Sequence, residues 1–398
     1  MNGTTPGFPG LLFLMMMLAA GPLSSVWADS PAGSERREGL ETSITELLRE
    51  HGVPGASIAV IEDYQVLWAR GFGVTSLYGG APVTETTRFQ ACSLSKPVAV
   101  QALLTLVESG QVDLDQPANH YLRRWQIPDN EGFSGDAITV RQLVTHSAGL
   151  TASFFPGYRP GEELPASLVD MLLGIPPTTS EAVVPNLAPG SRWRYSGGGL
   201  LVVQLLIEDV TGEDFAAFMQ STVLGPLDMR DSTYVAPYPH ELRDVSAKGY
   251  SLDGTPVPGG YREYPAAAVA GLWTTASDLA RSMVSVQKSA NGLAGGLLTP
   301  AVARQMLSVQ DTGTPPVIDK IPTFDPRMGL GYLLEGRDPV SGNPPRFWHW
   351  GDNPGFKALQ VGTLEGGKGV VVLTNSDVGV EVTRPIAELI AAAYGWSL

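Results

Sequence analysis

The sequence predicts an α/β (α+β) fold in which an antiparallel sheet is flanked by helices and joined to a mainly helical subdomain. Three observations favour this fold. A helix pattern and a pair of strand patterns stand near each end of the chain. The middle, from about residue 110 to 330, is rich in helix starts and loops. Sequential strands usually lie side by side, so both terminal pairs are expected intact in one sheet.

The composition of the 398-residue chain excludes several classes of protein. Hydrophobic residues make up 43% and charged residues 17%, which excludes a disordered chain or a coiled coil. The net charge of −14 argues against nucleic-acid binding, because phosphates repel such a surface. The single cysteine, Cys92, cannot form an intrachain disulfide. The five histidines lie far apart, so neither a metal nor another cofactor is expected.

The N-terminal segment has the pattern of an export signal. Leu11–Ala20 is an apolar run of ten residues, which as a helix spans only ~15 Å, about half of a bilayer core. Small residues around Ala28 fit a cleavage site. The pattern therefore predicts a signal peptide over residues 1–28, a periplasmic or secreted protein, and no stable membrane span after cleavage. Residues 1–10 lack Lys and Arg, so an uncleaved tether or a buried N-terminal helix stays open.

The next elements follow from periodicity. Residues 29–38 are polar and are expected to be flexible. Apolar residues at i, i+4, i+7 and i+8 from Leu40 predict a helix. Residues 56–61 and 66–72 are typical of strands, and residues 62–64 of the tight turn between them.

A buried helix is predicted to begin close to Ser93. Residues 97–109 are nearly all apolar, and Gly110 is a typical helix stop. Pro97 has no N–H group and is tolerated only in the first helical turn. The helix start therefore carries the pattern Ser93-x-x-Lys96.

This pattern places a hydroxyl and an amine on one helix face, close enough for proton transfer. A free lysine has a pKa of about 10.4, so a base working near pH 7 needs a pKa lowered by ~3 units. Burial and a neighbouring cationic or phenolic group can supply that change. Backbone N–H groups at the helix start could stabilise an oxyanion. The same pattern is common on protein surfaces, so it is weak by itself.

Further helix starts are marked by capping patterns beginning at Thr139, Thr211 and Thr275. Residues 311–327 contain four prolines and are expected to form a surface loop. Near the C-terminus the order of the N-terminal elements is mirrored. The strands are expected at 358–364 and 369–373, with Gly362–Lys368 as their turn, and the closing helix at 386–393.

Together with the Ser93–Lys96 pattern, other motifs carry a resemblance to a known family. The chain resembles the serine β-lactamase and penicillin-binding-protein superfamily, in its class C-like branch of β-lactamase-related hydrolases, D-aminopeptidases and esterases. The resemblance covers about residues 40–395 and implies a β-lactamase/transpeptidase-like fold, with a catalytic domain over 39–398. The matching pieces, in the order of the family, are Ser93–Lys96, 138–150, 189–196, 225–229, 270–279 and 349–351.

The resemblance implies a role for each of five residues. Ser93 would be the nucleophile that forms an acyl-enzyme, and Lys96 its proton acceptor. Tyr195 matches a tyrosine that relays protons, and a phenol beside an amine of similar pKa forms a coupled pair. His349 replaces the lysine of the family's Lys-Thr-Gly motif. The N–H groups of Ser93 and Asp352 would form the oxyanion hole.

Two departures from the family pattern concern the substrate. Gly197 stands where the Tyr-x-Asn motif has asparagine, so an amide that would hold Lys96 and the substrate is missing. His349 and Trp350 offer little fixed charge to a substrate carboxylate. Esters or uncharged amides are therefore favoured over β-lactams and terminal D-Ala-D-Ala. The residues expected to contact substrate are Trp350, Gly351, Asp352 and Gly197.

The sequence thus predicts an exported serine hydrolase for a small ester, amide or peptide substrate, of unspecified oligomeric state. A β-lactamase or D,D-carboxypeptidase stays open, as does a silent relative that binds peptidoglycan fragments or a partner. His146 is interpreted as structural, and Cys92 as a small buried packing residue. The aromatic residues that could form a cleft wall are Phe154, Phe155, Tyr158, Trp273 and Trp350, with core packing equally open for the first three.

Overall fold

The structure is a computed structural model that describes residues 1, 3, 31–318, 325–336 and 345–396. It consists of two compact units, residues 1–39 and residues 40–398. Apart from residues 1 and 3, the expected signal peptide lies outside the described residues. Of the helices in the described ranges, none combines the length and the apolar character needed to span a bilayer.

The first helix, α2 (Pro31–Glu50), is longer than expected. Residues 31–38 form its first turns, and the flexibility expected for residues 29–38 stays a prediction. Proline is tolerated at a helix start, and Glu and Arg are good helix formers that continue into the amphipathic part. In that part Leu40, Ile44 and Leu48 are buried, as their spacing predicts.

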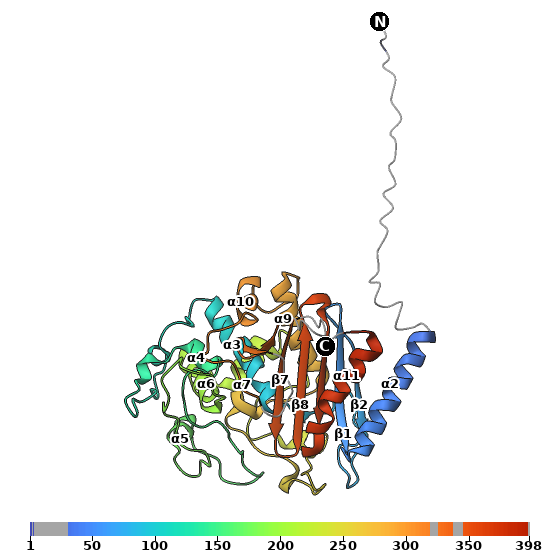
Figure 1. Cartoon of the computed structure of the whole chain (residues 1–398), viewed down its shortest axis with the longest axis horizontal. Coiled ribbons are helices and arrows are strands. Elements are labelled where there is room, and N and C mark those ends of the chain that lie inside the picture. The colour runs from blue at the N-terminus through green and yellow to red at the C-terminus, as the bar shows by residue number, and fades with distance from the viewer. Residues whose placement is uncertain (2, 4–30, 319–324, 337–344, 397–398) are drawn as a thin grey trace. The chain divides into compact units, whose positions relative to one another are not determined.

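One antiparallel sheet of seven strands includes the hairpins near both ends of the unit formed by residues 40–398 (Figure 1). The strand order is β2-β1-β9-β8-β7-β6-β5. The N-terminal hairpin meets the C-terminal one where β1 pairs with β9, with Ile58 opposite Val372. The expected shared sheet is therefore confirmed. The strands are β1 (Gly55–Glu62), β2 (Gln65–Gly73), β5 (Pro326–Met328), β6 (Leu333–Glu335), β7 (Arg346–Asn353), β8 (Phe356–Thr363) and β9 (Gly369–Thr374).

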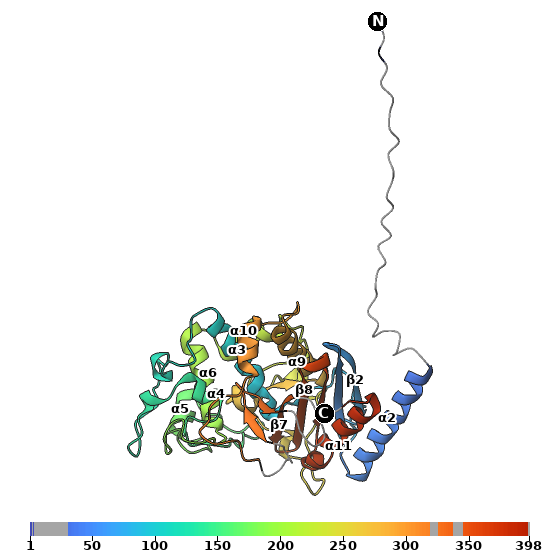
Figure 2. The ribbon, with the colours of Figure 1, turned by 45° about the horizontal axis from the view of Figure 1, so that its top comes forward.

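Helices cover both faces of this sheet because its side chains alternate between two apolar clusters. In β1, Ile58 and Val60 face the cluster that includes α11 (Thr383–Tyr394). Ala59 and Ile61 face the other cluster, which includes α3 (Ser95–Glu108) and α9 (Ala276–Asn291). Figure 2 shows α3 and α9 on the side of β8 away from α11. The face covered by α11 is called the outer face below.

The regular elements described between β2 and β5 are mainly helices, joined by loops, together with one short strand pair. The prediction of a subdomain with boundaries at about 110 and 330 stays a prediction. The elements of this segment besides α3 and α9 are β3 (Phe89–Gln90), α4 (Val140–Val144), α5 (Leu168–Leu173), α6 (Gly197–Thr211), α7 (Phe215–Met219), α8 (His240–Arg243), β4 (Trp273–Thr274) and α10 (Pro300–Met306).

Two of the three capping predictions are confirmed. Thr139 forms the full capping box of α4, and the Thr275 side chain caps α9. The third is wrong by three residues: Asp214 caps α7 by accepting from the Ala217 N–H. Thr211 is the last residue of α6, and its hydroxyl donates to the Ile207 carbonyl one turn earlier in the same helix. The cap of α7 is therefore Asp214.

Two predicted connections can be compared with the structure. Gly362–Lys368 links β8 to β9, as expected for a hairpin turn. The expected loop 311–327 lies partly outside the described residues, and β5 begins at its residue 326.

Candidate active site

Ser93 lies in a 3-10 turn, Cys92–Leu94, that runs directly into α3. Pro97 falls in the first turn of α3, as the sequence predicts. Cys92 has a φ of +54°, which is strained for a residue with a side chain. Its buried Sγ lies 3.4 Å from the backbone carbonyls of Gln90 and Phe356, either of which can accept from the thiol. The packed Cys92 thus fixes the turn that presents the half-buried Ser93 hydroxyl.

Lys96 is buried behind Ser93, with only 1% of its surface exposed. Its Nζ donates to Ser93 Oγ at 2.9 Å and to the Val269 carbonyl at 2.8 Å. Within the described residues no carboxylate forms an ion pair with it. Burial lowers the pKa of Lys96 from 10.5 to about 7. With this pKa the Lys96 amine can accept and release a proton near neutral pH.

Tyr195 directly precedes α6, where the Ser196 side chain caps the helix by accepting from the Gly199 N–H at 3.1 Å. The Lys96 Nζ lies 5.1 Å from the centroid of the Tyr195 ring. Burial raises the pKa of the phenol, although its hydrogen bond with Ser93 acts in the opposite direction. The Tyr195 phenol, which is distant in the sequence, therefore lies beside the neighbouring Ser93 hydroxyl and Lys96 amine.

His349 is buried on β7 beside this group. Its Nδ1 lies 2.7 Å from the Trp350 carbonyl, which can only accept, so we assign the ring hydrogen to Nδ1 and the lone pair to Nε2. Burial, followed by the charge of Lys96, lowers the pKa of His349 to about 3. The imidazole is therefore neutral across the physiological range.

An aromatic cluster surrounds the Tyr195 ring. The Trp350 indole lies 5.4 Å from it and stacks on His349 at 5.2 Å, measured between ring centroids. His146 lies 4.4 Å from Tyr195 on another side. Its Nδ1 accepts from the Ser196 N–H at 3.2 Å, and burial holds its pKa well below 6.5. No spacing in the sequence reveals this contact between His146 and Tyr195. The only signal was that both lie in motifs of the family.

Gly351 allows β7 to approach the Ser93 turn closely. A Cβ at this position would lie 2.7 Å from the Ala91 carbonyl and 2.8 Å from the Cys92 Cβ. Only glycine avoids these contacts, and the following residue is Asp352. Its N–H is therefore a candidate to share an oxyanion with the N–H of Ser93.

The structure explains why position 197 is a glycine. A Cβ there would meet the Phe155 ring at 3.0 Å and the Ser153 carbonyl at 3.2 Å. The space that a side chain would need is thus taken by a core aromatic residue. The Val269 carbonyl provides Lys96 with a second acceptor in a site without the family's asparagine.

The expected aromatic cleft wall is only partly present. Phe155, Tyr158 and Trp273 are core residues, each 5% exposed or less. Trp273 stacks on a buried tyrosine, so its assignment to the wall is wrong. Trp350 is half-buried beside the site, and Phe154 is 59% exposed. Over the described ranges, no group of three His, Cys, Asp or Glu residues is placed to hold a metal ion.

Comparisons with known proteins identify the family and the fold of this chain. The family model described as Beta-lactamase matches residues 40–394. Esterase EstB of Burkholderia gladioli is 27% identical, over 85% of this chain and 90% of its own length. Penicillin-binding protein 4* of Bacillus subtilis is 25% identical, over 55% of this chain and 46% of its own. The octameric penicillin-binding protein homologue from Pyrococcus abyssi superimposes with a TM-score of 0.72 at 24% identity, covering 91% of this chain and 78% of that one.

Proposed function

This chain belongs to the beta-lactamase family and is a serine hydrolase, and we propose that it cleaves esters or uncharged amides through an acyl-enzyme on Ser93. One observation carries the proposal. The Lys96 amine is buried, donates to Ser93 Oγ at 2.9 Å and has a pKa lowered to about 7. A neutral amine at that distance can take the hydroxyl proton as the oxygen attacks.

The acylation step follows from these positions. Lys96 accepts the proton of Ser93, whose oxygen forms a bond to the substrate carbonyl carbon. The carbonyl oxygen becomes an oxyanion and accepts from the N–H groups of Ser93 and Asp352, where each such donor stabilises the transition state by up to about 3 kcal/mol. The proton then passes through Tyr195 to the leaving oxygen or nitrogen as the bond to carbon breaks.

Deacylation reverses these roles with water as the nucleophile. As the water oxygen bonds to the acyl carbon, Tyr195 relays one water proton to the neutral Lys96 amine. The bond between the acyl carbon and the Ser93 oxygen then breaks, Lys96 returns the proton to that oxygen, and the acid is released. The neutral His349 offers a lone pair on Nε2, and we assign it a place as an acceptor beside this proton pathway.

The electrostatics of the site favour substrates without a carboxylate. The His349 ring is neutral, because burial lowers its pKa to about 3, and the neighbouring Trp350 indole carries no charge. Neither side chain can bind a carboxylate as a cation would. The name of the relative EstB, an esterase, points in the same direction. A β-lactamase or D,D-carboxypeptidase activity is therefore the less favoured alternative.

A substrate panel tests the proposal. The panel contains 4-nitrophenyl acetate, a neutral amino-acid amide, an acyl-D-Ala-D-Ala peptide and a chromogenic cephalosporin. We expect turnover of the ester by the wild type and a loss of at least ~10³-fold in Ser93→Ala. The matched control is Ser308→Ala, which changes an exposed serine and should keep full activity.

Labelling identifies the nucleophile independently of turnover. A fluorophosphonate probe should add one label on Ser93, found by peptide mass spectrometry. A label on another residue, or ester turnover that survives Ser93→Ala, would contradict the assignment. Faster hydrolysis of the cephalosporin than of the ester would favour the β-lactamase alternative.

Export is a separate proposal. It is supported by the apolar run Leu11–Ala20 and the small residues before Asp29. The intact mass of the protein recovered from a secreting host should correspond to a chain that begins at Asp29. A mass that includes residues 1–28 would contradict cleavage.

A further inference from the structure

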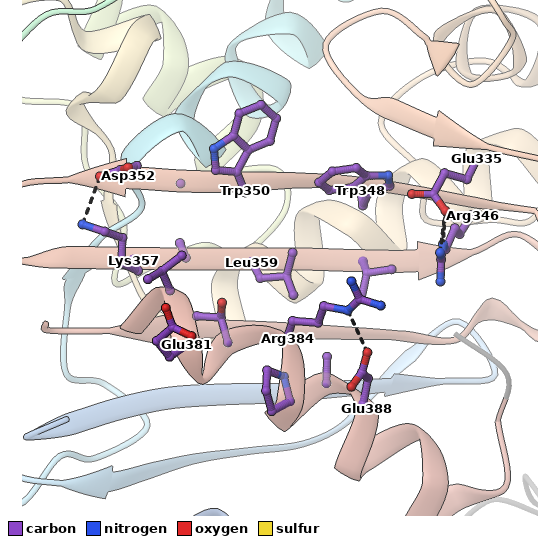
Figure 3. Close-up of a pocket in the computed structure, with 17 residues that line it drawn as sticks. Glu335, Arg346, Trp348, Trp350, Asp352, Lys357, Leu359, Glu381, Arg384 and Glu388 are labelled. Atoms are coloured by element: carbon purple, nitrogen blue, oxygen red, sulfur yellow. Dashed lines mark hydrogen bonds and ion pairs between the residues drawn. The ribbon is translucent and has the colours of Figure 1, made fainter. Parts of the chain in front are cut away.

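A groove of about 320 Å³ lies on the outer face of the sheet, between β7, β8 and α11 (Figure 3). Its apolar lining comes from two neighbouring strands. Trp348 and Trp350 project from β7, and Leu359 and Val361 project from β8. The two indoles lie 5.9 Å apart. Such a surface binds flat or aliphatic groups through burial of apolar area.

The charged residues of the groove are largely paired with one another. Arg346 pairs with Glu335, Lys357 with Asp352, and Arg384 with Glu388. Each of the three cations in the lining thus lies against a carboxylate. The groove therefore suits an uncharged apolar group better than an anion.

Trp350 connects this groove to the candidate active site. Its indole lines the groove and also lies 5.4 Å from the Tyr195 ring. On the side away from β8, β6 pairs with β7 only up to Trp348, and no described strand continues this pairing. The edge of β7 is therefore open at Trp350, and Figure 3 shows the indole extending beyond that edge, away from β8.

We propose that the groove binds the alcohol part of an apolar ester, with Trp350 as the surface over which this group passes. The inference rests on the proposed function and adds the substrate class to it. Tyr195 delivers a proton to the leaving oxygen, so the leaving alcohol must lie beside Tyr195. The Trp350 indole, 5.4 Å from the Tyr195 ring, lies beside that position and also forms a wall of the groove. A long alkyl or aromatic alcohol is thus led into the groove.

Two ester series separate the alcohol side from the acid side. One series contains acetates of straight-chain alcohols of increasing length, which all give the same acyl-enzyme. The other contains methyl esters of straight-chain acids. We expect kcat/KM to rise in the acetate series once the alcohol passes Trp350, by up to about fourfold for each methylene that becomes buried. The acid series should depend less on length.

A charge at the rim should remove this dependence. Val380 lines the groove and is 41% exposed, so Val380→Asp is expected to fold. It should lower kcat/KM for the longest acetate about tenfold and leave ethyl acetate unchanged, because a carboxylate beside the bound chain must stay hydrated. The matched control Val245→Asp changes a 56% exposed valine outside the lining of the groove. It should leave kcat/KM unchanged for both acetates.

A second variant places a larger side chain in the groove. Ala387 lines the groove from α11 but is only 4% exposed, so urea unfolding first establishes that Ala387→Phe folds. The folded variant should then shorten the longest accepted alcohol. Unchanged length dependence in both Val380→Asp and Ala387→Phe, or dependence found in the acid series alone, would overturn the inference. If the wild type cleaves neither the ester nor the amide of the substrate panel, both proposals fail. If it cleaves only the amide, this inference alone fails. If it cleaves acetates with no dependence on the alcohol, only this inference fails.

Discussion

Two lysines are buried in different parts of the molecule, one in the candidate site and one at the turn between β7 and β8. Lys96 is 1% exposed and Lys357 is 9% exposed. The Lys96 amine donates to a hydroxyl and a backbone carbonyl. The Lys357 amine lies 3.0 Å from Asp352 and also pairs with Asp377. The two sites therefore differ in the charge of their partners far more than in burial.

The pKa values of the two amines move in opposite directions. Burial lowers the pKa of Lys96 to about 7. For Lys357 burial acts in the same sense, but the charges of Asp352 and Asp377 outweigh it and raise the pKa above 10.5. The comparison teaches that burial makes a lysine a base only when no carboxylate accompanies it into the interior.

Lys357 has a structural use for its permanent charge. It donates to the Asn353 carbonyl at 3.2 Å, while Asp377 accepts from the Gly355 N–H at 2.9 Å. These bonds hold the turn that follows Asp352, the second candidate donor to the oxyanion. One lysine is thus assigned to proton transfer and the other to the position of the strand end.

The largest expected effect is on activity. Lys96→Met removes the base and should lower kcat/KM for the ester by about 10³-fold or more, near 4 kcal/mol of transition-state stabilisation. Lys96→Arg should not rescue it, because a guanidinium stays protonated. Lys357→Met, the matched variant, should lose much less, since its amine does not contact Ser93. Equal losses in the Lys96 and Lys357 variants would contradict the division of roles.

The next effect is on stability and its dependence on pH. Because the pKa of Lys96 is lowered on folding, from 10.5 to about 7, the folded state binds fewer protons than the unfolded state between these values, and stability rises with pH there. Below pH 7 the Lys96 amine is charged in the folded state as well, and its destabilisation of the fold is at its largest. Lys96→Met should therefore stabilise the protein more at pH 6 than at pH 9, by roughly 3 kcal/mol.

Urea unfolding of wild type and Lys96→Met at both pH values gives this difference directly. The same ionisation should make kcat/KM of the wild type rise as pH passes about 7, because only the neutral amine accepts a proton. A stability difference that is independent of pH would show that Lys96 keeps its ordinary pKa.

The smallest expected effect concerns the paired lysine. Lys357→Met leaves Asp352 and Asp377 without their cation and should destabilise the fold by about 2 kcal/mol at pH 7, below the 3–5 kcal/mol of a fully buried pair. The reduction follows because the Asp352 side chain is 42% exposed. The stabilisation from Lys357 is present below pH 10.5 and is lost as pH rises through its raised folded-state pKa.

Urea unfolding also measures this effect, with the exposed pair of Arg159 and Glu162 as the control. Arg159→Met should change stability very little, because exposed ion pairs contribute little. If Lys357→Met lowers the free energy of unfolding no more than Arg159→Met does, the ion pairs of Lys357 make no net contribution to stability.

The sequence by itself determined the features that depend on neighbouring residues. Strand geometry over a few residues makes successive side chains of β1 and β9 point to opposite faces of the sheet. Helix geometry likewise sets the start of α3 near Pro97 and the proximity of Ser93 to Lys96. A sheet shared by the N-terminal and C-terminal strands could also be inferred, because a helix and a pair of strands stand near each end of the chain. The extension of α2 to Pro31 was missed because polar residues alone do not separate a solvated helix from a loop.

Only the tertiary structure decided which groups surround each lysine. Val269 lies 173 residues from Lys96 in the chain, and Asp377 lies 20 residues from Lys357 across a strand pair. The contact of His146 with Tyr195 and the groove that begins at Trp350 likewise arise from packing between distant segments. A side chain's pKa depends on the water and charge that packing leaves around it. Local sequence fixes which residues can react, and the folded interior fixes their protonation.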